Sequence, residues 1–315
     1  MLIILPRVSA KGALEGLKLS ADILVPAVFP FAVPVIFLVG TGVFGKSRHK
    51  MLILYVLSLL GGYPLGAKLI SELKNSGDIS GANAEKLLPF CVNAGPSFIV
   101  SAIGTGILGD KKLGYILLIS HILSSVILTF IFNHKLLFSK TVGAKMRGMP
   151  AFDNFVYSVH AAANATIYIC AFVVVFSVGG AFAEHFSTGS SFAFLINLFE
   201  VTTAVSRSRN VYYISFLLGF SGFCVWMQVL SQEKTSLFRF AVIRTTHGAL
   251  SFITTALIMK ISGTAVQTLG NVGDVCFTAD SSGYALAFSM LVMILLLLVS
   301  ISSKNHTGNL LKDVI

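Results

Sequence analysis

The sequence predicts an all-α integral membrane protein: a polytopic bundle of transmembrane helices with two structural repeats and broken, discontinuous helices near the membrane midplane. Three observations predict this fold. First, 55% of the 315 residues are hydrophobic and only 11% are charged, whereas about a quarter of residues are charged in soluble domains. Second, apolar runs of membrane-spanning length follow one another along the chain. Third, polar and helix-breaking residues interrupt these runs in the same order in both halves, as in many transporters.

The apolar runs define the expected helices in order. A helix needs about 20 residues to cross the hydrocarbon core. Runs of this kind lie near residues 21–44, 51–70, 86–108, 113–133, 154–183, 192–206, 211–231, 237–259 and 284–302. The run at 192–206 is short, so we expect about eight or nine crossings. They divide into a first repeat (1–150), a second repeat (151–262), and a polar loop with a C-terminal transmembrane helix (263–315).

Two interruptions lie in the first repeat. A backbone leaves helical geometry inside a bilayer only where protein or a water-filled cavity satisfies its polar groups. We therefore expect both interruptions to line a central solute-binding cavity. The residues that form them are Gly62, Tyr63, Pro64 and Gly66 in the first, and Asn93, Gly95, Pro96 and Ser97 in the second. The alternative for the second interruption is a kinked helix that is capped by its own Asn93.

The segment after Pro64 is expected to begin a half-helix, because proline removes one helix hydrogen bond. The free N–H groups and the positive dipole end of such a half-helix favour an anionic group. Lys68 lies one turn into it and can pair with a carboxylate. The alternative is that Lys68 extends to the membrane interface and pairs with Glu72, four residues further on.

In the second repeat, Glu200 is the only acidic residue well inside an apolar run. Carboxylates within membranes are costly, and this makes them functional candidates. Glu200 can hold a coupling proton or cation, or it can hydrogen-bond a substrate together with the hydroxyls of Thr202 and Thr203. The alternative is a structural ion pair with Arg207 or Arg244.

Further polar residues in the second half add to the expected solute site. Gln228 follows the Gly-rich stretch 219–222, as an amide beside an interruption. Arg244 and His247 are three residues apart on one helix face and can hold a carboxylate. His121 occupies the place in the first half that His247 occupies in the second. For the histidines and the glutamine, hydrogen bonding between packed helices is the alternative.

The charge of +10 is distributed over short loops between apolar runs. We interpret it as a topology signal and as contact with lipid headgroups, and not as a nucleic-acid surface. The basic loop at 134–153 and Arg207 can both be cytoplasmic in one topology. That topology leaves the basic residues at 46–50 on the opposite side, which indicates a re-entrant segment or a miscounted crossing in the first half.

Signatures of enzymes are absent from the sequence. We find no phosphate-binding loop, no dinucleotide fingerprint, no metal-ligand cluster and no activated nucleophile. The four cysteines are widely spaced and have no metal-binding or redox pattern. We therefore expect no catalytic residues, no cofactor and no metal. The expected partners are a small-molecule solute, membrane lipids, and a coupling proton or sodium ion.

Several motifs occur together in one order. They are residues 26–31 (PAVFPF), 62–69 (GYPLGAKL), 93–99 (NAGPSFI) and His121, then Glu200, Thr202, residues 219–222, Gln228 and His247. With these motifs the chain resembles the sporulation integral membrane protein family whose domains are called nucleoside-recognition or Gate domains. One departure is Ala204, where a glycine is expected after the Glu-x-Thr-Thr motif.

The resemblance implies a multi-pass cell-membrane protein of endospore-forming bacteria, related to the gating elements of concentrative nucleoside transporters. One branch of the family is associated with moving dipicolinate from the mother cell towards the forespore, which implies the outer forespore membrane. The excess of Lys68, Arg244 and His247 over Glu200 suits such a dicarboxylate. Our leading expectation is therefore a transporter of a small anionic solute, namely dipicolinate. The alternatives are a nucleoside permease and a non-transporting subunit of a sporulation membrane complex.

Overall fold

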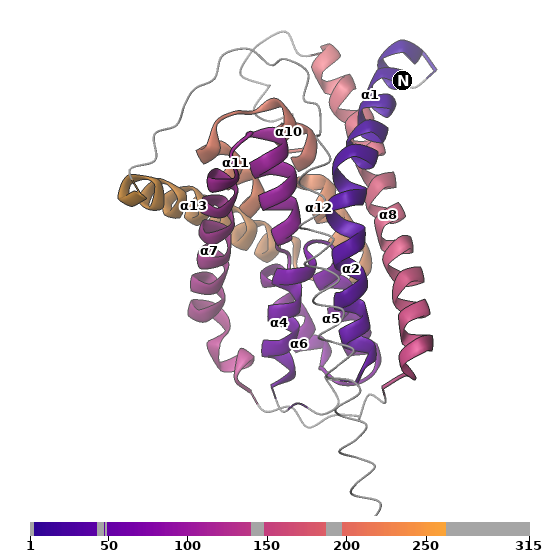
Figure 1. Cartoon of the computed structure of the whole chain (residues 1–315), viewed down its shortest axis with the longest axis vertical. Coiled ribbons are helices and arrows are strands. Elements are labelled where there is room, and N and C mark those ends of the chain that lie inside the picture. The colour runs from indigo at the N-terminus through magenta and orange to yellow at the C-terminus, as the bar shows by residue number, and fades with distance from the viewer. Residues whose placement is uncertain (1–2, 43–46, 48, 140–147, 187–196, 263–315) are drawn as a thin grey trace, which may run out of the picture.

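The computed structural model describes residues 3–42, 47, 49–139, 148–186 and 197–262 (Figure 1). Within these residues every regular element is a helix. Five helical stretches of this part of the chain are long and apolar enough to cross a membrane: Pro6–Gly40, Lys111–Leu137, Ala151–Phe186, Val211–Gln232 and Leu237–Ser262. The expected C-terminal loop and helix, 263–315, lie outside the described residues.

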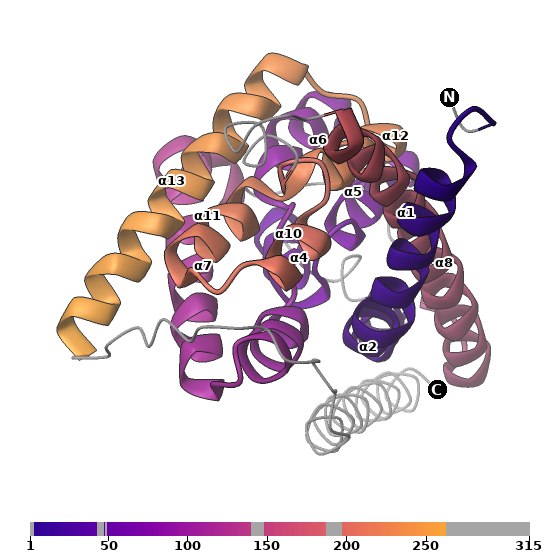
Figure 2. The ribbon, with the colours of Figure 1, turned by 90° about the horizontal axis from the view of Figure 1, so that it is seen from above.

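The longest stretch at the N-terminal end consists of α1 (Pro6–Leu19), a short π-helical segment η1 (Ser20–Leu24) and α2 (Val25–Gly40). It packs along α8 (Ala151–Phe186), and the two lie side by side in both views (Figures 1 and 2). They run antiparallel, because the α1 end lies against the end of α8 and the α2 end against its beginning.

Glycine permits the close approach of α1 to α8. A Cβ atom on Gly12 would lie 2.7 Å from the Cα atom of Val178, and one on Gly16 would lie 2.7 Å from the Cα atom of Val174. Small residues spaced by four positions let membrane helices approach through their backbones. This Gly-x-x-x-Gly pattern therefore sets the distance between the two long helices.

Helices α4 (Lys50–Gly61) and α5 (Leu65–Asn75) form an antiparallel hairpin. At the open end of the hairpin, Lys50 forms a buried ion pair with Asp78, which follows α5. The run 51–70, which we expected to be a crossing, therefore returns to the side from which it starts. This hairpin removes the conflict over the basic residues at 46–50.

The chain continues through α6 (Gly81–Leu87), the short η2 (Leu88–Phe90) and the π-helical η3 (Phe98–Ile107), which packs against α7 (Lys111–Leu137). Residues 91–95, between η2 and η3, are not helical. In the first half, helical geometry is thus lost at 62–64 and at 91–95, within the segments singled out by their Gly, Pro and Asn residues.

The second half contains α10 (Val201–Arg207), α11 (Val211–Phe220), α12 (Gly222–Gln232) and α13 (Leu237–Ser262). Helices α11 and α12 are separated by Ser221, whose φ of 76° lies in the left-handed region. Helix α13 packs against both α11 and α7. In Figure 2, α13 lies next to α11 and α7.

The expected topology is wrong on a second point. Arg207 forms an ion pair with Glu184 near the C-terminal end of α8, whereas Met149 lies just before its first residue. The whole length of α8 therefore separates Arg207 from the basic loop that we expected on the same side. The reason is the run 192–206: its described part is a turn followed by α10, whose seven residues are too few to cross a membrane.

The glycine contact between α1 and α8 yields a stability prediction. Gly12→Ala and Gly16→Ala should each destabilise the protein by about 1–3 kcal/mol, because the added methyl group meets backbone atoms of α8. Gly179→Ala is the matched control, since a Cβ atom there meets nothing within 4 Å. Thermal unfolding in detergent measures the effect. Equal melting temperatures for all three variants would contradict the close packing.

Candidate functional site

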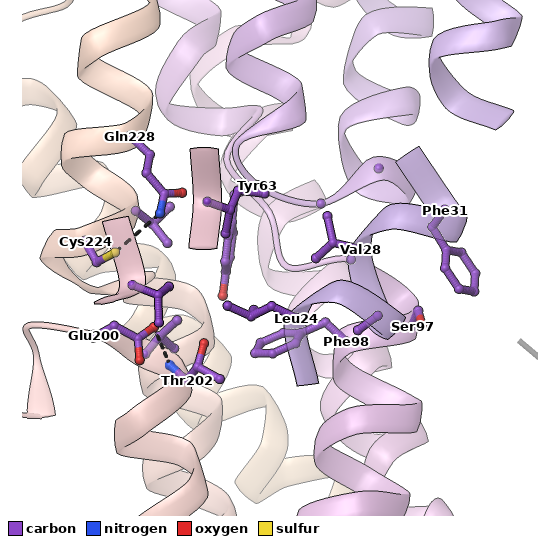
Figure 3. A pocket seen from close by; sticks show the side chains of 18 of the residues that line it. Leu24, Val28, Phe31, Tyr63, Ser97, Phe98, Glu200, Thr202, Cys224 and Gln228 are labelled. Atoms are coloured by element: carbon purple, nitrogen blue, oxygen red, sulfur yellow. Dashed lines mark hydrogen bonds between the residues drawn. The ribbon is translucent and has the colours of Figure 1, made fainter. Parts of the chain in front are cut away.

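A cavity lies where the interruptions of both halves meet (Figure 3). Its walls come from α2, the turn between α4 and α5, the start of η3, α8, the start of α10, and α12. The space between the lining atoms, its opening included, is about 530 Å³.

Most polar residues of the cavity lie on one side of Tyr63, and most apolar residues lie on the other. Figure 3 shows Glu200, Thr202 and Gln228 on one side of Tyr63, and Leu24, Val28 and Phe98 on the other. The polar residues among the lining are Tyr63, Ser97, Glu200, Thr202 and Gln228. Such an arrangement can hold a solute that has both an apolar face and hydrogen-bonding groups.

Two polar atoms of the lining residues have no hydrogen-bond partner in the part of the chain that the structure describes. They are the hydroxyl oxygen of Tyr63 and the side-chain oxygen of Gln228, and both are buried. The Gln228 amide nitrogen donates to the Cys224 sulfur at 3.3 Å. An unsatisfied buried polar atom costs about 1–3 kcal/mol. The two atoms thus have unused hydrogen-bonding capacity in residues that line the cavity.

Glu200 is buried and caps the N-terminus of α10. Its carboxylate accepts hydrogen bonds from the backbone N–H groups of Thr202 at 2.8 Å and Thr203 at 2.6 Å, and from the Thr203 hydroxyl at 2.8 Å. An acidic side chain at this position satisfies N–H groups that have no partner within the helix. These bonds fix the carboxylate at the cavity wall.

Arg207 and Arg244, the two cations that we considered as partners of Glu200, make their described contacts elsewhere. Arg207 forms ion pairs with Glu15 and Glu184. The guanidinium of Arg244 donates to backbone carbonyls and to a hydroxyl, as described next. Within the described residues, Glu200 is therefore held by hydrogen bonds and not by an ion pair.

Arg244 is only 1% exposed, and its side chain connects η2 to the end of α11. Its guanidinium donates to the carbonyl oxygen of Pro89 at 3.3 Å, to that of Gly219, and to the Ser221 hydroxyl at 2.5 Å. Carbonyls at helix ends have no partner within their helix. Arg244 supplies that partner for η2 and α11. It is not among the residues that line the cavity.

The two histidines contact each other. The ring centroids of His121 and His247 are 4.7 Å apart. His121 Nε2 accepts a hydrogen bond from the backbone N–H of Ala94 at 3.0 Å, and His247 Nε2 lies 3.2 Å from the carbonyl oxygen of His121. The pair joins α7 to α13 and supports the 91–95 segment. Neither histidine lines the cavity.

Of the remaining predicted residues, some line the cavity and the others only contact neighbouring segments. Gly62 and Gly95 line the cavity and touch each other, since a Cβ atom on Gly62 would lie 2.9 Å from the Gly95 nitrogen. Asn93 donates to the carbonyl oxygen of Phe90 at 2.9 Å, which is the helix-capping alternative. The predicted residues that are not among the described lining are Pro64, Gly66, Lys68, Asn93, Pro96, His121, Thr203, Arg244 and His247.

Lys68 and Gly66 both contribute to the packing of α5 against neighbouring segments. The Lys68 ammonium lies 3.5 Å from the carbonyl oxygen of Ala161 on α8. A Cβ atom on Gly66 would lie 1.9 Å from the carbonyl oxygen of Cys91, so only glycine permits this approach. In the structure, Lys68 therefore lies against α8 and away from the cavity.

Sequence reasoning missed part of the site. Leu24, Val28 and Phe31 on the first long helix form the apolar wall, and Cys224 lies beside Gln228. The motif at 26–31 includes two of these residues, but its apolar composition also fits lipid contact. The cysteines, Cys224 among them, were considered only for metal-binding and redox patterns. Only the assembled fold brings these residues to the polar ones.

The contacts of Arg244 yield a second prediction. Arg244→Gln should lower the stability by about 2–4 kcal/mol, because buried carbonyl groups lose their donors. Arg239→Gln on the same helix is the control, since Arg239 is only partly buried and its side chain has one long contact, with the Lys86 carbonyl. Thermal unfolding in detergent compares the two. An Arg244→Gln variant as stable as the control would refute a structural role.

Comparison with known proteins identifies one curated relative. The chain is distantly homologous to the sporulation integral membrane protein YlbJ of Bacillus subtilis (strain 168): 23% of 328 aligned residues are identical, over 81% of this chain and 78% of the relative. No family model and no solved structure matches. The chain is thus a multi-pass membrane protein homologous to a bacterial sporulation integral membrane protein.

Proposed function

We propose that this chain is a secondary transporter of a small polar solute and that the cavity at the helix interruptions is its solute site. One observation carries the proposal: interruptions from both halves surround a cavity whose lining includes buried polar atoms without partners. Transporters bind their substrates near the middle of the membrane, at discontinuous helices of paired repeats.

The order and length of the elements support a two-repeat architecture. The stretch Pro6–Gly40 has 35 residues and its proposed counterpart, α8, has 36. Helices α7 and α13 have 27 and 26 residues, and His121 and His247 each lie ten positions after the start of their helix. The interruptions at 62–64 and 91–95 then correspond to the non-helical residues 198–200 before α10 and to Ser221.

The contact between the two interruptions of the first half has a counterpart in the second half. In the first half, Gly62 touches Gly95. In the second half, the backbone N–H of Cys224 donates to the carbonyl oxygen of Phe199 at 2.8 Å, beside Glu200. Each half thus brings its two interruptions together. This arrangement supports a site at the interface between repeats, around which the two halves can rock for alternating access.

The charge of the lining favours a neutral or cationic solute. Glu200 is the only charged residue among the described lining, and Lys68 and Arg244 are not part of it. A dicarboxylate would therefore face a buried carboxylate without a cation from these residues, which is unfavourable at low dielectric. A nucleoside offers hydroxyl and base N–H groups to Glu200, and its base can contact Tyr63 and Phe98.

The first test is uptake into proteoliposomes. Labelled nucleoside and labelled dipicolinate are compared under a proton and under a sodium gradient, with empty liposomes alongside. We expect nucleoside uptake. Gln228→Leu should reduce it about tenfold, because a loss of about 1.4 kcal/mol of hydrogen bonding to the solute is a tenfold effect. Gln232→Leu, one turn further along α12 and outside the described lining, is the matched control.

The outcomes of this test separate the three functions. Uptake of dipicolinate alone would overturn the charge argument and restore the anionic solute. The third function, a non-transporting subunit of a sporulation membrane complex, predicts no uptake by folded protein and no solute-dependent rise in its melting temperature. The coupling ion, a proton or sodium held at Glu200, follows from the gradient that drives uptake.

Tyr63 provides a separate prediction. Tyr63→Phe should leave the solute-free protein equally stable or up to about 1 kcal/mol more stable, because it removes a buried hydroxyl without a partner. Solute uptake should fall at the same time. Tyr55→Phe is the control: its hydroxyl lies 2.9 Å from the Ser125 hydroxyl, and losing this bond should cost about 1 kcal/mol. If Tyr63→Phe were less stable than Tyr55→Phe, the claim that the Tyr63 hydroxyl has no hydrogen-bond partner would be contradicted.

A further inference from the structure

A second cavity lies between α8 and the segment that includes α10. The space between its lining atoms is about 280 Å³. Its polar lining residues include Ser177 and Glu184 from α8, and Asn197, Thr203 and Arg207 from the second segment. This cavity offers hydrogen-bonding groups, and among the described residues it shares only Glu200 with the site described above.

Glu200 separates the two cavities. It is the one residue that lines both, among the residues that the structure describes. Its neighbours divide between them, since Thr202 lines the central cavity and Thr203 lines the second. A movement of this carboxylate, or of the turn that bears it, would therefore join the two spaces.

The far end of the second cavity is bounded by Arg207. One guanidinium nitrogen lies 2.6 Å from the Glu15 carboxylate of α1, and the other forms an ion pair with Glu184 of α8. The three side chains are 36%, 28% and 37% exposed. They thus lie at the boundary between the cavity and the surroundings, and they connect α10 to the two long helices.

We propose that the second cavity is the route between the central site and one membrane surface, and that Arg207, together with Glu15 and Glu184, closes it. This inference rests on the proposed transport function. A route for a polar solute needs polar walls, which Ser177, Asn197 and Thr203 supply. Partly exposed ion pairs are weak enough to break and reform during each cycle, so they suit a gate better than a buried pair does.

Alkylation of cysteines by a water-soluble thiol reagent tests the route without requiring transport. Cys224 is a native reporter for the central cavity, and Ser177→Cys places a reporter of similar size in the second. Labelling rates at both positions are read by peptide mass spectrometry on the full chain in liposomes. Arg207→Gln should raise both rates about fivefold, the size expected from releasing two partly exposed ion pairs.

Three controls make the result specific. Arg209→Gln removes the same charge two residues away and should leave both rates unchanged. Lys74→Gln breaks the pair of Lys74 with Glu233, which joins α5 to the end of α12, and should not raise them either. Glu184→Gln should give a smaller rise than Arg207→Gln, because the pair with Glu15 remains.

The outcomes distinguish this inference from the transport proposal. Rates in Arg207→Gln and Glu184→Gln equal to those in Arg209→Gln would overturn the gate. Faster labelling at residue 177 without faster labelling of Cys224 would overturn the connection between the cavities. If the rates rise as expected but no solute is taken up, the closure stands and the transport function fails. If solute is taken up and the rates do not change, only this inference fails.

Discussion

The structure depends on one constraint: backbone groups that leave helical geometry inside an apolar bundle need partners from elsewhere in the chain. Three of the interruptions meet this need with a particular side chain. Glu200 satisfies N–H groups at the start of α10, and His121 accepts from the N–H of Ala94. Arg244 donates to the carbonyls of Pro89 and Gly219. These buried polar residues hold the interruptions against one another.

The position relative to the cavity separates two groups of buried polar residues. Arg244 and His121 hold protein groups by hydrogen bonds and do not line the cavity, although Arg244 Nε and His121 Nδ1 have no partner within the described residues. The hydroxyl of Tyr63 and the side-chain oxygen of Gln228 have no described partner and belong to residues that line the cavity. We infer that the first group maintains the shape of the site, while the second group awaits a solute. Glu200 belongs to both, because it caps a helix and forms part of the wall.

The sequence predicted the parts of the fold that have local causes. Hydropathy predicted helices of membrane-spanning length, and Gly62 and Pro64 predicted an interruption because they disfavour helix wherever they occur. Hydropathy cannot distinguish a crossing from a hairpin, so the run 51–70 was misinterpreted. The pair of Lys50 with Asp78, which closes that hairpin, joins residues that become neighbours only in the fold.

The site was less predictable for a related reason. A sequence does not show whether the donors of a buried arginine bond a solute or backbone carbonyl groups. Arg244 was therefore assigned to the solute, whereas in the structure it bonds carbonyl groups. The anionic solute followed from the family resemblance and from counting Arg244, Lys68 and His247 at the site. Gly62, Tyr63, Ser97, Glu200 and Gln228 were placed at the site by their chain interruptions, and the structure does place them around one cavity. Which residues face a cavity depends on long-range packing.

The most direct test of a solute site at the interruptions is the alkylation rate of native Cys224 with and without nucleoside. Cys224 lines the cavity, whereas Cys170 on α8 is outside the described lining and serves as an internal reference. Our account predicts that nucleoside slows the labelling of Cys224 and leaves that of Cys170 unchanged. If neither nucleoside nor dipicolinate changes the rate at Cys224 in folded protein, the cavity is not a solute site.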